Sequence, residues 1–350
     1  MKISTHNHWD PLEEIIVGIA NHARIPTVDR STMSMSYTNY PMDKIKPLEG
    51  AYPQWLIDEA NEDMDELADT LRKFNVKVHR PLPVDHSVEF STPEWKTTGW
   101  YTWCPRDLLL PLDNLMIETP SACRARYFET RAYRNIMIEA IEDGTEWIAA
   151  PKPILSDDSY QFDNIDKTPS LLNLEPVFDA PNCVRLGKDI LFQISNTGNH
   201  LGLKWLKNVL ERRGYRVHPA EHIYSYAHMD STIIPLRPGL VLLNSTRVNP
   251  DNCPKLFEKW NKIYFEDVTV LPPPPGSVSP CSPYIGMNIL SIDPHTVVVG
   301  KEQTNLMREL EKHKITPVPV SLRHAQTLSG GLHCATLDLR RRGSLEDYFT

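Results

Sequence analysis

Residues 183–218 read CVRLGKDILFQISNTGNHLGLKWLKNVLERRGYRVH, and they outline one complete structural unit. Two apolar runs, 183–186 and 189–192, flank Gly187-Lys188, a pair typical of a two-residue hairpin turn. Residues 201–210 then place apolar side chains at helical spacing, and the β-rich run 215–218 follows Gly214. The stretch therefore predicts a hairpin followed by a helix and a third strand.

The same order of elements recurs along the chain. Paired apolar runs split by turn residues predict further hairpins at 108–117, 232–243 and 288–299. Helical patterns lie at 55–74, 122–141, 256–260 and 304–310, and β-rich runs follow at 76–79, 147–148 and 315–320. A unit that recurs about five times, at intervals of roughly 50 to 70 residues, predicts a radially repeated α/β structure. The alternative is an ordinary α+β domain with irregular spacing.

A polar residue heads each expected hairpin. A radial structure brings its strand ends together at one central face, so we expect these side chains to converge there. They are Asp107, Asp179, Asp230 and Asn288, with Asp338 in the closing segment.

The composition is that of an ordinary globular protein. The 350 residues include 37 Lys and Arg against 45 Asp and Glu, a net charge of −8. Without a long basic run, this balance argues against nucleic acid or a membrane surface as a partner. No stretch approaches the ~18 uninterrupted apolar residues of a membrane span, and nothing resembles a targeting peptide. Since no linker or composition break divides the chain, we expect one domain over 1–350.

The six cysteines lie scattered and form no CxxC pair. A chain of this length can bury a core without disulfides, so we expect reduced thiols in a cytoplasmic protein. Metal sites have weak support, because no second ligand pair with zinc spacing accompanies His333-Cys334. No phosphate-binding glycine loop and no GxSxG motif is present either.

The run 329–338, Ser-Gly-Gly-Leu-His-Cys-Ala-Thr-Leu-Asp, contains a candidate nucleophile. Its two glycines allow backbone or ligand to approach closely, and Cys334 follows them between His333 and Ala335. The alternative is a buried structural cysteine at the start of a strand.

A catalytic cysteine needs partners that hold its thiolate and move protons. His228 and Asp230 head an expected strand, where a period of two would place both on one face. His228 could instead be a satisfied core histidine. Asp107 and Asp179 lie beside apolar runs, and such carboxylates suit a planar cationic guanidinium. They could instead cap turns or pair with Arg106 and Arg185.

The run 330–341, Gly-Gly-Leu-His-Cys-Ala-Thr-Leu-Asp-Leu-Arg-Arg, resembles the active-site signature of the L-arginine amidinotransferases. This family includes glycine amidinotransferase, the inosamine-phosphate enzymes of streptomycin pathways and cyanobacterial toxin enzymes, and the saxitoxin-pathway type is our nearest match. The resemblance implies an α/β pentein propeller with five pseudo-repeats around a central active site. Further resembling stretches lie at 9–14, 16–18, 105–107, 124–133, 150–153, 175–180, 228–230 and 286–288.

The resemblance also implies roles for individual residues. Cys334 matches the nucleophile, His228 the general acid and base, and Asp107 and Asp179 the carboxylates that hold the guanidinium. Residues that match positions contacting the amino-acid end of the substrate are Asp230, Arg247 and Ser282.

One stretch departs from glycine amidinotransferase. That enzyme carries Asn and Met at the positions of Ser225 and Ala227, whereas the inosamine-phosphate enzymes carry Ser and Thr. Small side chains here imply a roomier acceptor pocket, and hence an amine larger than glycine.

The expected reaction transfers the amidino group of L-arginine to an amine through an amidino-cysteine intermediate, and it requires no cofactor. An arginine deiminase is the rival enzyme, since it shares the Cys, His and Asp set and uses water as the acceptor. A non-catalytic binding protein is disfavoured because all the expected chemical residues are present. The resemblance makes a homodimer the expected assembly.

Overall fold

The stretch 183–218 folds as its pattern predicts. In the computed structural model, which describes residues 1–161 and 170–349, β10 (Cys183–Leu186) pairs antiparallel with β11 (Asp189–Gln193). Gly187 has a φ of +67° at the turn, a conformation that favours glycine. Helix α5 (His200–Leu210) follows, and β12 (Arg216–Ala220) returns parallel to β11. The unit is therefore a three-stranded sheet with one crossover helix.

Five sheets of this kind occur in the described residues, each with an antiparallel pair and a parallel third strand. One of them joins the two ends of the chain, because β19 pairs with β1 in the register Val17 to Thr336. This arrangement confirms the predicted α/β propeller of five pseudo-repeats. Besides β10–β12, its strands are β7 (Leu109–Leu112), β8 (Leu115–Glu118) and β9 (Glu146–Ala149); β13 (Ile233–Arg237), β14 (Leu240–Asn244) and β15 (Asn261–Phe265); β16 (Leu290–Asp293), β17 (Thr296–Gly300) and β18 (Thr316–Val320); and β19 (Thr336–Arg341), β1 (Leu12–Val17) and β4 (Lys77–His79).

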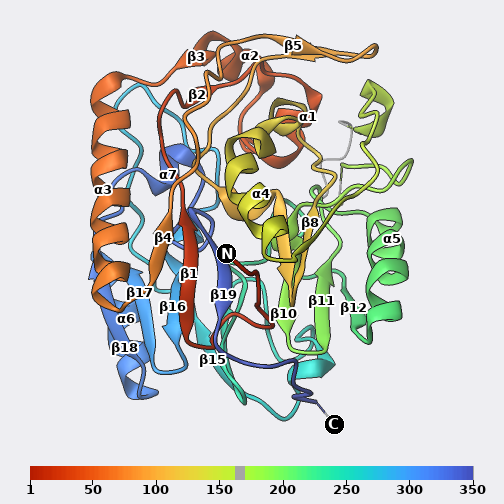
Figure 1. Cartoon of the computed structure of the whole chain (residues 1–350). Coiled ribbons are helices and arrows are strands. Elements are labelled where there is room, and N and C mark those ends of the chain that lie inside the picture. The colour runs from red at the N-terminus through yellow and green to blue at the C-terminus, as the bar shows by residue number, and fades with distance from the viewer. Residues whose placement is uncertain (162–169, 350) are drawn as a thin grey trace.

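The longer helices lie outside the strands. Figure 1 shows α3 (Gln54–Lys73) and α5 at opposite sides of the molecule, with strands between them. Helix α3 buries Leu56, Met64 and Leu71 along one stripe, as its sequence periodicity predicts. The remaining α-helices are α1 (Arg30–Met35), α2 (Met42–Ile45), α4 (Arg134–Glu142), α6 (Thr304–Lys312) and α7 (Ala325–Leu328). Two small antiparallel sheets pair β2 (Arg24–Ile25) with β3 (Gly50–Ala51) and β5 (Phe90–Ser91) with β6 (Lys96–Thr97).

Two predicted helices differ from the structure. The pattern at 122–141 forms two 3₁₀ segments, Arg124–Arg126 and Glu129–Tyr133, before α4 begins. Arg124 and Arg126 turn their side chains inward to buried hydrogen-bond partners, which an exposed helix face would not permit. The pattern at 256–260 forms only one 3₁₀ turn, Lys255–Phe257, after Pro254.

Asp338 differs from its expected place at the head of a hairpin. It lies within β19, where its buried carboxylate pairs with Arg106 at 2.8 Å, Arg185 at 2.7 Å and Arg341 at 2.8 Å. Cys334 instead precedes β19, as the other polar residues precede their hairpins. The structure thus places an ion cluster where strands from different repeats meet, and a cysteine just before the antiparallel pair of β19 and β1.

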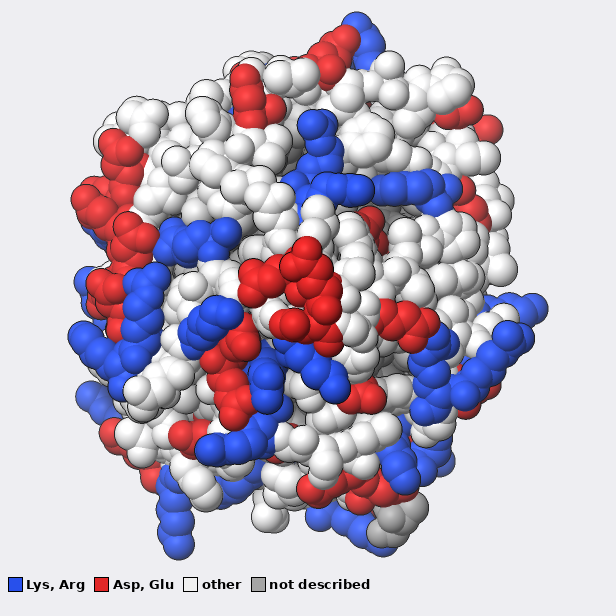
Figure 2. All heavy atoms as spheres, in the orientation of Figure 1, with Lys and Arg blue, Asp and Glu red and all other residues white. Residues whose placement is uncertain are grey.

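The surface carries both signs of charge. On the face seen in Figure 2, lysine and arginine side chains alternate with aspartate and glutamate. Within the described residues, no helix has both the length and the apolar character needed to cross a bilayer.

Candidate active site

The hairpin heads bring most of the predicted site residues together. Asp107 ends the 3₁₀ segment Pro105–Asp107, and Asp179 caps the segment Ala180–Asn182. His228 and Asp230 precede β13 in irregular backbone, so the expectation that they share a strand face is wrong. The strand begins at Ile233.

His228 is held by two carboxylates. Its Nε2 lies 2.9 Å from Asp179 Oδ2, and its Nδ1 lies 3.6 Å from Asp107 Oδ1. Burial opposes the charged imidazole, but the Asp107 charge and the Asp179 hydrogen bond outweigh it and raise the pKa of His228 well above 6.5. The partner of His228 is therefore Asp179, and the predicted pairing with Asp230 is wrong.

Asp230, which was expected to pair with His228, lies beside Cys334. The Sγ of Cys334 is 3.2 Å from Asp230 Oδ2, and the backbone N–H of Cys334 donates to Asn288 Oδ1 at 2.9 Å. A Cβ on Gly331 would lie 2.5 Å from the Asn288 Cβ, which explains the glycine in the signature. Contact with Cys104, burial and the Asp230 charge together raise the pKa of the Cys334 thiol well above 9.0, although His228 acts in the opposite direction.

Asp230 also binds His333. The same Oδ2 lies 2.9 Å from His333 Nδ1, so His333 and Cys334 contact one carboxylate oxygen. Burial and Arg106 lower the pKa of His333 to about 4, which leaves this imidazole neutral at pH 7. Burial opposes ionisation of Asp230. The hydrogen bond from His333 and the electrostatic effect of the same ring nevertheless keep the pKa of Asp230 below its usual value.

Asp107 is paired with a residue that the sequence did not single out. Arg126 Nη1 donates to Asp107 Oδ2, and Arg126 also binds Glu129. The alternative, in which Asp107 and Asp179 pair with Arg106 and Arg185, is wrong because both arginines bind Asp338. The signal for Arg126 was its place in the resembling stretch 124–133. In the described part of the chain, Asp107 Oδ1 and Asp179 Oδ1 are buried and accept no hydrogen bond.

A cavity of about 260 Å³ opens on this cluster. Its wall includes His228, Asp230 and Cys334, whereas Asp107 and Asp179 are not part of it. Of the two residues expected to shape the acceptor pocket, Ala227 lines this cavity and Ser225 does not. The Ser225 carbonyl accepts a hydrogen bond from Asn196 N. The remaining wall residues are Met35, Thr38, Asn39, Tyr224, Tyr226, Ser231, Arg247, Ser279, Pro280, Cys281, Ser282, Pro283, Tyr284, Ile285 and Ser329.

Arg247 and Ser282 lie together in this wall. Arg247 Nη1 donates to Thr232 Oγ1 at 2.7 Å, and Nη2 donates to Ser282 Oγ. Asp230, expected in the same group, instead lies against the sulfur of Cys334. The cavity thus has a nucleophile with a carboxylate at one place and a buried guanidinium at another.

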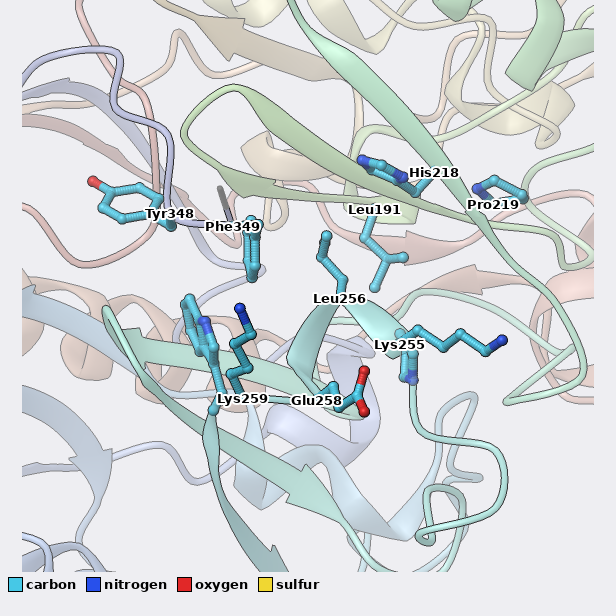
Figure 3. A pocket seen from close by; sticks show the side chains of 11 residues that line it. Leu191, His218, Pro219, Lys255, Leu256, Glu258, Lys259, Tyr348 and Phe349 are labelled. Carbon is cyan, nitrogen blue, oxygen red and sulfur yellow. The ribbon is translucent and has the colours of Figure 1, made fainter.

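A second cavity, of about 620 Å³, has different chemistry. Figure 3 shows its labelled side chains, which come from β11, β12, the segment 254–260 and the C-terminal residues. Lys255, Lys259 and Glu258 line it together with Tyr348 and Phe349, and no cysteine is among its lining residues. The smaller cavity is therefore the candidate active site.

The described residues contain no group of three or more metal-binding side chains arranged to hold an ion. All six cysteines are free thiols. Two of them, Cys104 and Cys281, lie near Cys334, although no sequence motif marks either as a site residue.

No family model matches the chain, but individual proteins do. Inosamine-phosphate amidinotransferase 1 of Streptomyces glaucescens is 44% identical over 346 residues, which span 99% of each chain. The chain belongs to the amidinotransferase family. Like its relatives, it is an enzyme that transfers amidino groups.

Two solved structures of amidinotransferases match the whole chain. The inosamine-phosphate amidinotransferase of Streptomyces griseus has a TM-score of 0.96 and 45% identity, with 99% of each chain covered. SxtG, an amidinotransferase from Microseira wollei in the saxitoxin biosynthetic pathway, has a TM-score of 0.91 and 36% identity over the same share of each chain. The inosamine-phosphate and saxitoxin-pathway enzymes named in the resemblance are thus both found among the matches, and the identity is higher to the inosamine-phosphate enzyme.

Proposed function

We propose that this amidinotransferase moves the amidino group of L-arginine to a primary amine larger than glycine, releases L-ornithine and acts in natural-product biosynthesis. The observation that supports this most is the position of Cys334. Its sulfur lies 3.2 Å from Asp230 in the wall of a cavity that also contains His228 and Arg247. The cavity thus offers a nucleophile, a proton donor and a site for a carboxylate.

Arginine would bind with its guanidinium beside Asp230, the carboxylate that lines the cavity. This assignment revises the expectation from the sequence, because Asp107 and Asp179 both face His228 and neither lines the cavity. The amino-acid end of arginine would reach Arg247 and Ser282, where a guanidinium and a hydroxyl can bind its carboxylate.

The first half-reaction would begin when the guanidinium binds beside Asp230. This cation offsets the carboxylate that raises the pKa of Cys334, so the thiol can release its proton to water. The thiolate attacks the guanidinium carbon, and protonated His228 gives its proton to the departing ornithine nitrogen. The amidino group then remains on the sulfur.

In the second half-reaction the neutral amine attacks the amidino carbon. Neutral His228 accepts the proton of the amine, and the C–S bond breaks to restore the thiolate. Only the two substrates and the side chains take part, so we propose that no cofactor or metal is needed.

The acceptor is the second part of the proposal. Ala227 is a small residue in the cavity wall, and the family members with high identity to this chain include enzymes named for inosamine phosphate. Incubation with arginine and a panel of amines, with ornithine and each guanidino product measured by mass, tests both parts. Release of citrulline without a guanidino product would favour a deiminase. Preference for glycine over every larger amine would favour guanidinoacetate synthesis.

We also propose that residues 1–350 act as one domain, because β1 and β19 join the two ends of the chain in one sheet. A homodimer located in the cytoplasm remains our expectation. Light scattering of the purified protein tests whether it is a homodimer. Fractionation of the producing cells tests whether it is located in the cytoplasm.

A further inference from the structure

Arg247 lies near two aromatic rings in the wall of the active-site cavity. Its Cζ is 3.6 Å from the centre of the Tyr224 ring and 5.5 Å from that of Tyr284. Its other contacts are to hydroxyl groups, those of Thr232 at 2.7 Å and Ser231 at 3.3 Å, together with Ser282. The orientation of the guanidinium is therefore fixed by the face of the Tyr224 ring and by the hydroxyl groups that accept its N–H hydrogen bonds.

No carboxylate forms an ion pair with Arg247 in the described residues. The buried arginines of the strand cluster differ, since Arg106, Arg185 and Arg341 all pair with Asp338. Burial disfavours the charge of Arg247 and lowers its pKa, and Tyr224 and Tyr284 act in the opposite direction. The negative face of an aromatic ring can stabilise such a cation without neutralising it.

We infer that Tyr224 is a positioning residue, whose ring holds Arg247 in the orientation that binds the carboxylate of the amidino donor. This inference rests on the proposed function, in which the donor is arginine. A flexible arginine would lose more entropy on binding than one already fixed against a ring, so the stacked geometry favours donor binding. Tyr284 supports the same guanidinium from a greater distance.

The test compares Tyr224→Leu with Tyr224→Phe in single-turnover release of ornithine. Leucine removes the ring face, so half-saturation should need roughly 5- to 30-fold more arginine, while the rate at saturation changes little. Phenylalanine keeps the face and should stay within about 2-fold of the wild type. The matched control is Tyr264→Leu on exposed β15, which should leave both constants unchanged.

Agmatine, which is arginine without its carboxylate, separates this role from a structural one. If Tyr224 acts through Arg247, Tyr224→Leu should change agmatine turnover far less than arginine turnover. Equal losses with both donors, or an unchanged requirement for arginine, would overturn the inference. If Tyr224→Leu fails to fold, Tyr284→Leu is the second variant, with a smaller rise for arginine and none for agmatine. Wild-type protein that releases no ornithine would refute the proposed function itself.

Discussion

Asp230 and Cys334 share a contact of 3.2 Å between a carboxylate oxygen and the candidate nucleophilic sulfur. A carboxylate at this distance disfavours a thiolate, and it acts together with Cys104 and burial to raise the pKa of the thiol. The same carboxylate can bind a guanidinium, whose positive charge has the opposite effect. Without substrate, then, the thiol form of Cys334 is favoured, and in the proposed reaction arginine itself would supply the charge that activates it.

Asp230→Asn should therefore make Cys334 more reactive in the absence of substrate. Removing the negative charge lowers the pKa of the thiol, so half-maximal alkylation by iodoacetamide should move to lower pH. The measurement is the pH dependence of labelling of the peptide that contains Cys334. Cys253, which is only half-buried, is the internal control, and its labelling should not change. An unchanged or higher midpoint for Cys334 would contradict this account of the contact.

Arginine labelled in its guanidino carbon should leave the label on Cys334. Without an acceptor amine the amidino group is not transferred from the sulfur, so acid quenching should trap it on the peptide that carries this residue. Cys334→Ala should lose both half-reactions, because no other group can form the covalent intermediate. Label on a different cysteine, or on none, would reject the nucleophile assignment.

Replacing His228 should cost far more activity than replacing His333. His228 has a raised pKa and can donate a proton, whereas His333 has a pKa of about 4 and is neutral. Ornithine release should decline only as the pH rises through the raised pKa of His228. In Asp179→Asn the lost carboxylate lowers that pKa, so the decline should move to lower pH. Equal losses for the two histidine variants would mean that the proton donor is wrongly chosen.

The repeat order was predictable because turns and periodicity are local. Gly187-Lys188 and similar pairs fix hairpins within a few residues, and the helical pattern of α3 needs no knowledge of the rest of the chain. The helix expected at 122–141 failed for the opposite reason. Arg124 and Arg126 bind groups elsewhere in the structure, and those contacts override the local preference.

The candidate residues were also predictable, but their pairing was not. His228 binds Asp179, which is 49 positions away, while Asp230, only two positions away, binds Cys334 and His333. Spacing along the chain cannot reveal such contacts, since the two residues of each contact come from different repeats. Asp338 was misplaced for a similar reason, because two of its three arginine partners, Arg106 and Arg185, come from other repeats.

Asp338→Asn should destabilise the protein strongly. The change leaves buried arginines without their counter-charge, and removing one partner of a buried pair costs about 3–5 kcal/mol. Burial opposes ionisation of Asp338, but Arg185, Arg106 and Arg341 keep its pKa well below 3.8. Its contribution is therefore present above the unfolded pKa and is lost as the pH falls. Urea unfolding from pH 7 to pH 3 should show a steeper loss for wild type than for the variant, and parallel losses would contradict the role of the cluster.

The space beside Ala227 in the active-site cavity should select the acceptor amine. Ala227 lines the cavity and Ser225 does not, so the double variant Ser225→Asn with Ala227→Met should reduce use of a bulky amine almost entirely through Ala227→Met. Overpacking a fitted cavity costs roughly 1–3 kcal/mol, which corresponds to about 5- to 150-fold in kcat/KM. Ornithine release in single turnovers should change much less, because the guanidinium of arginine would be held beside Asp230. Ser225→Asn alone is the matched control. If it reduces use of the bulky amine as much as Ala227→Met does, or if the wild type prefers glycine to every larger amine, the acceptor is not selected by the space beside Ala227.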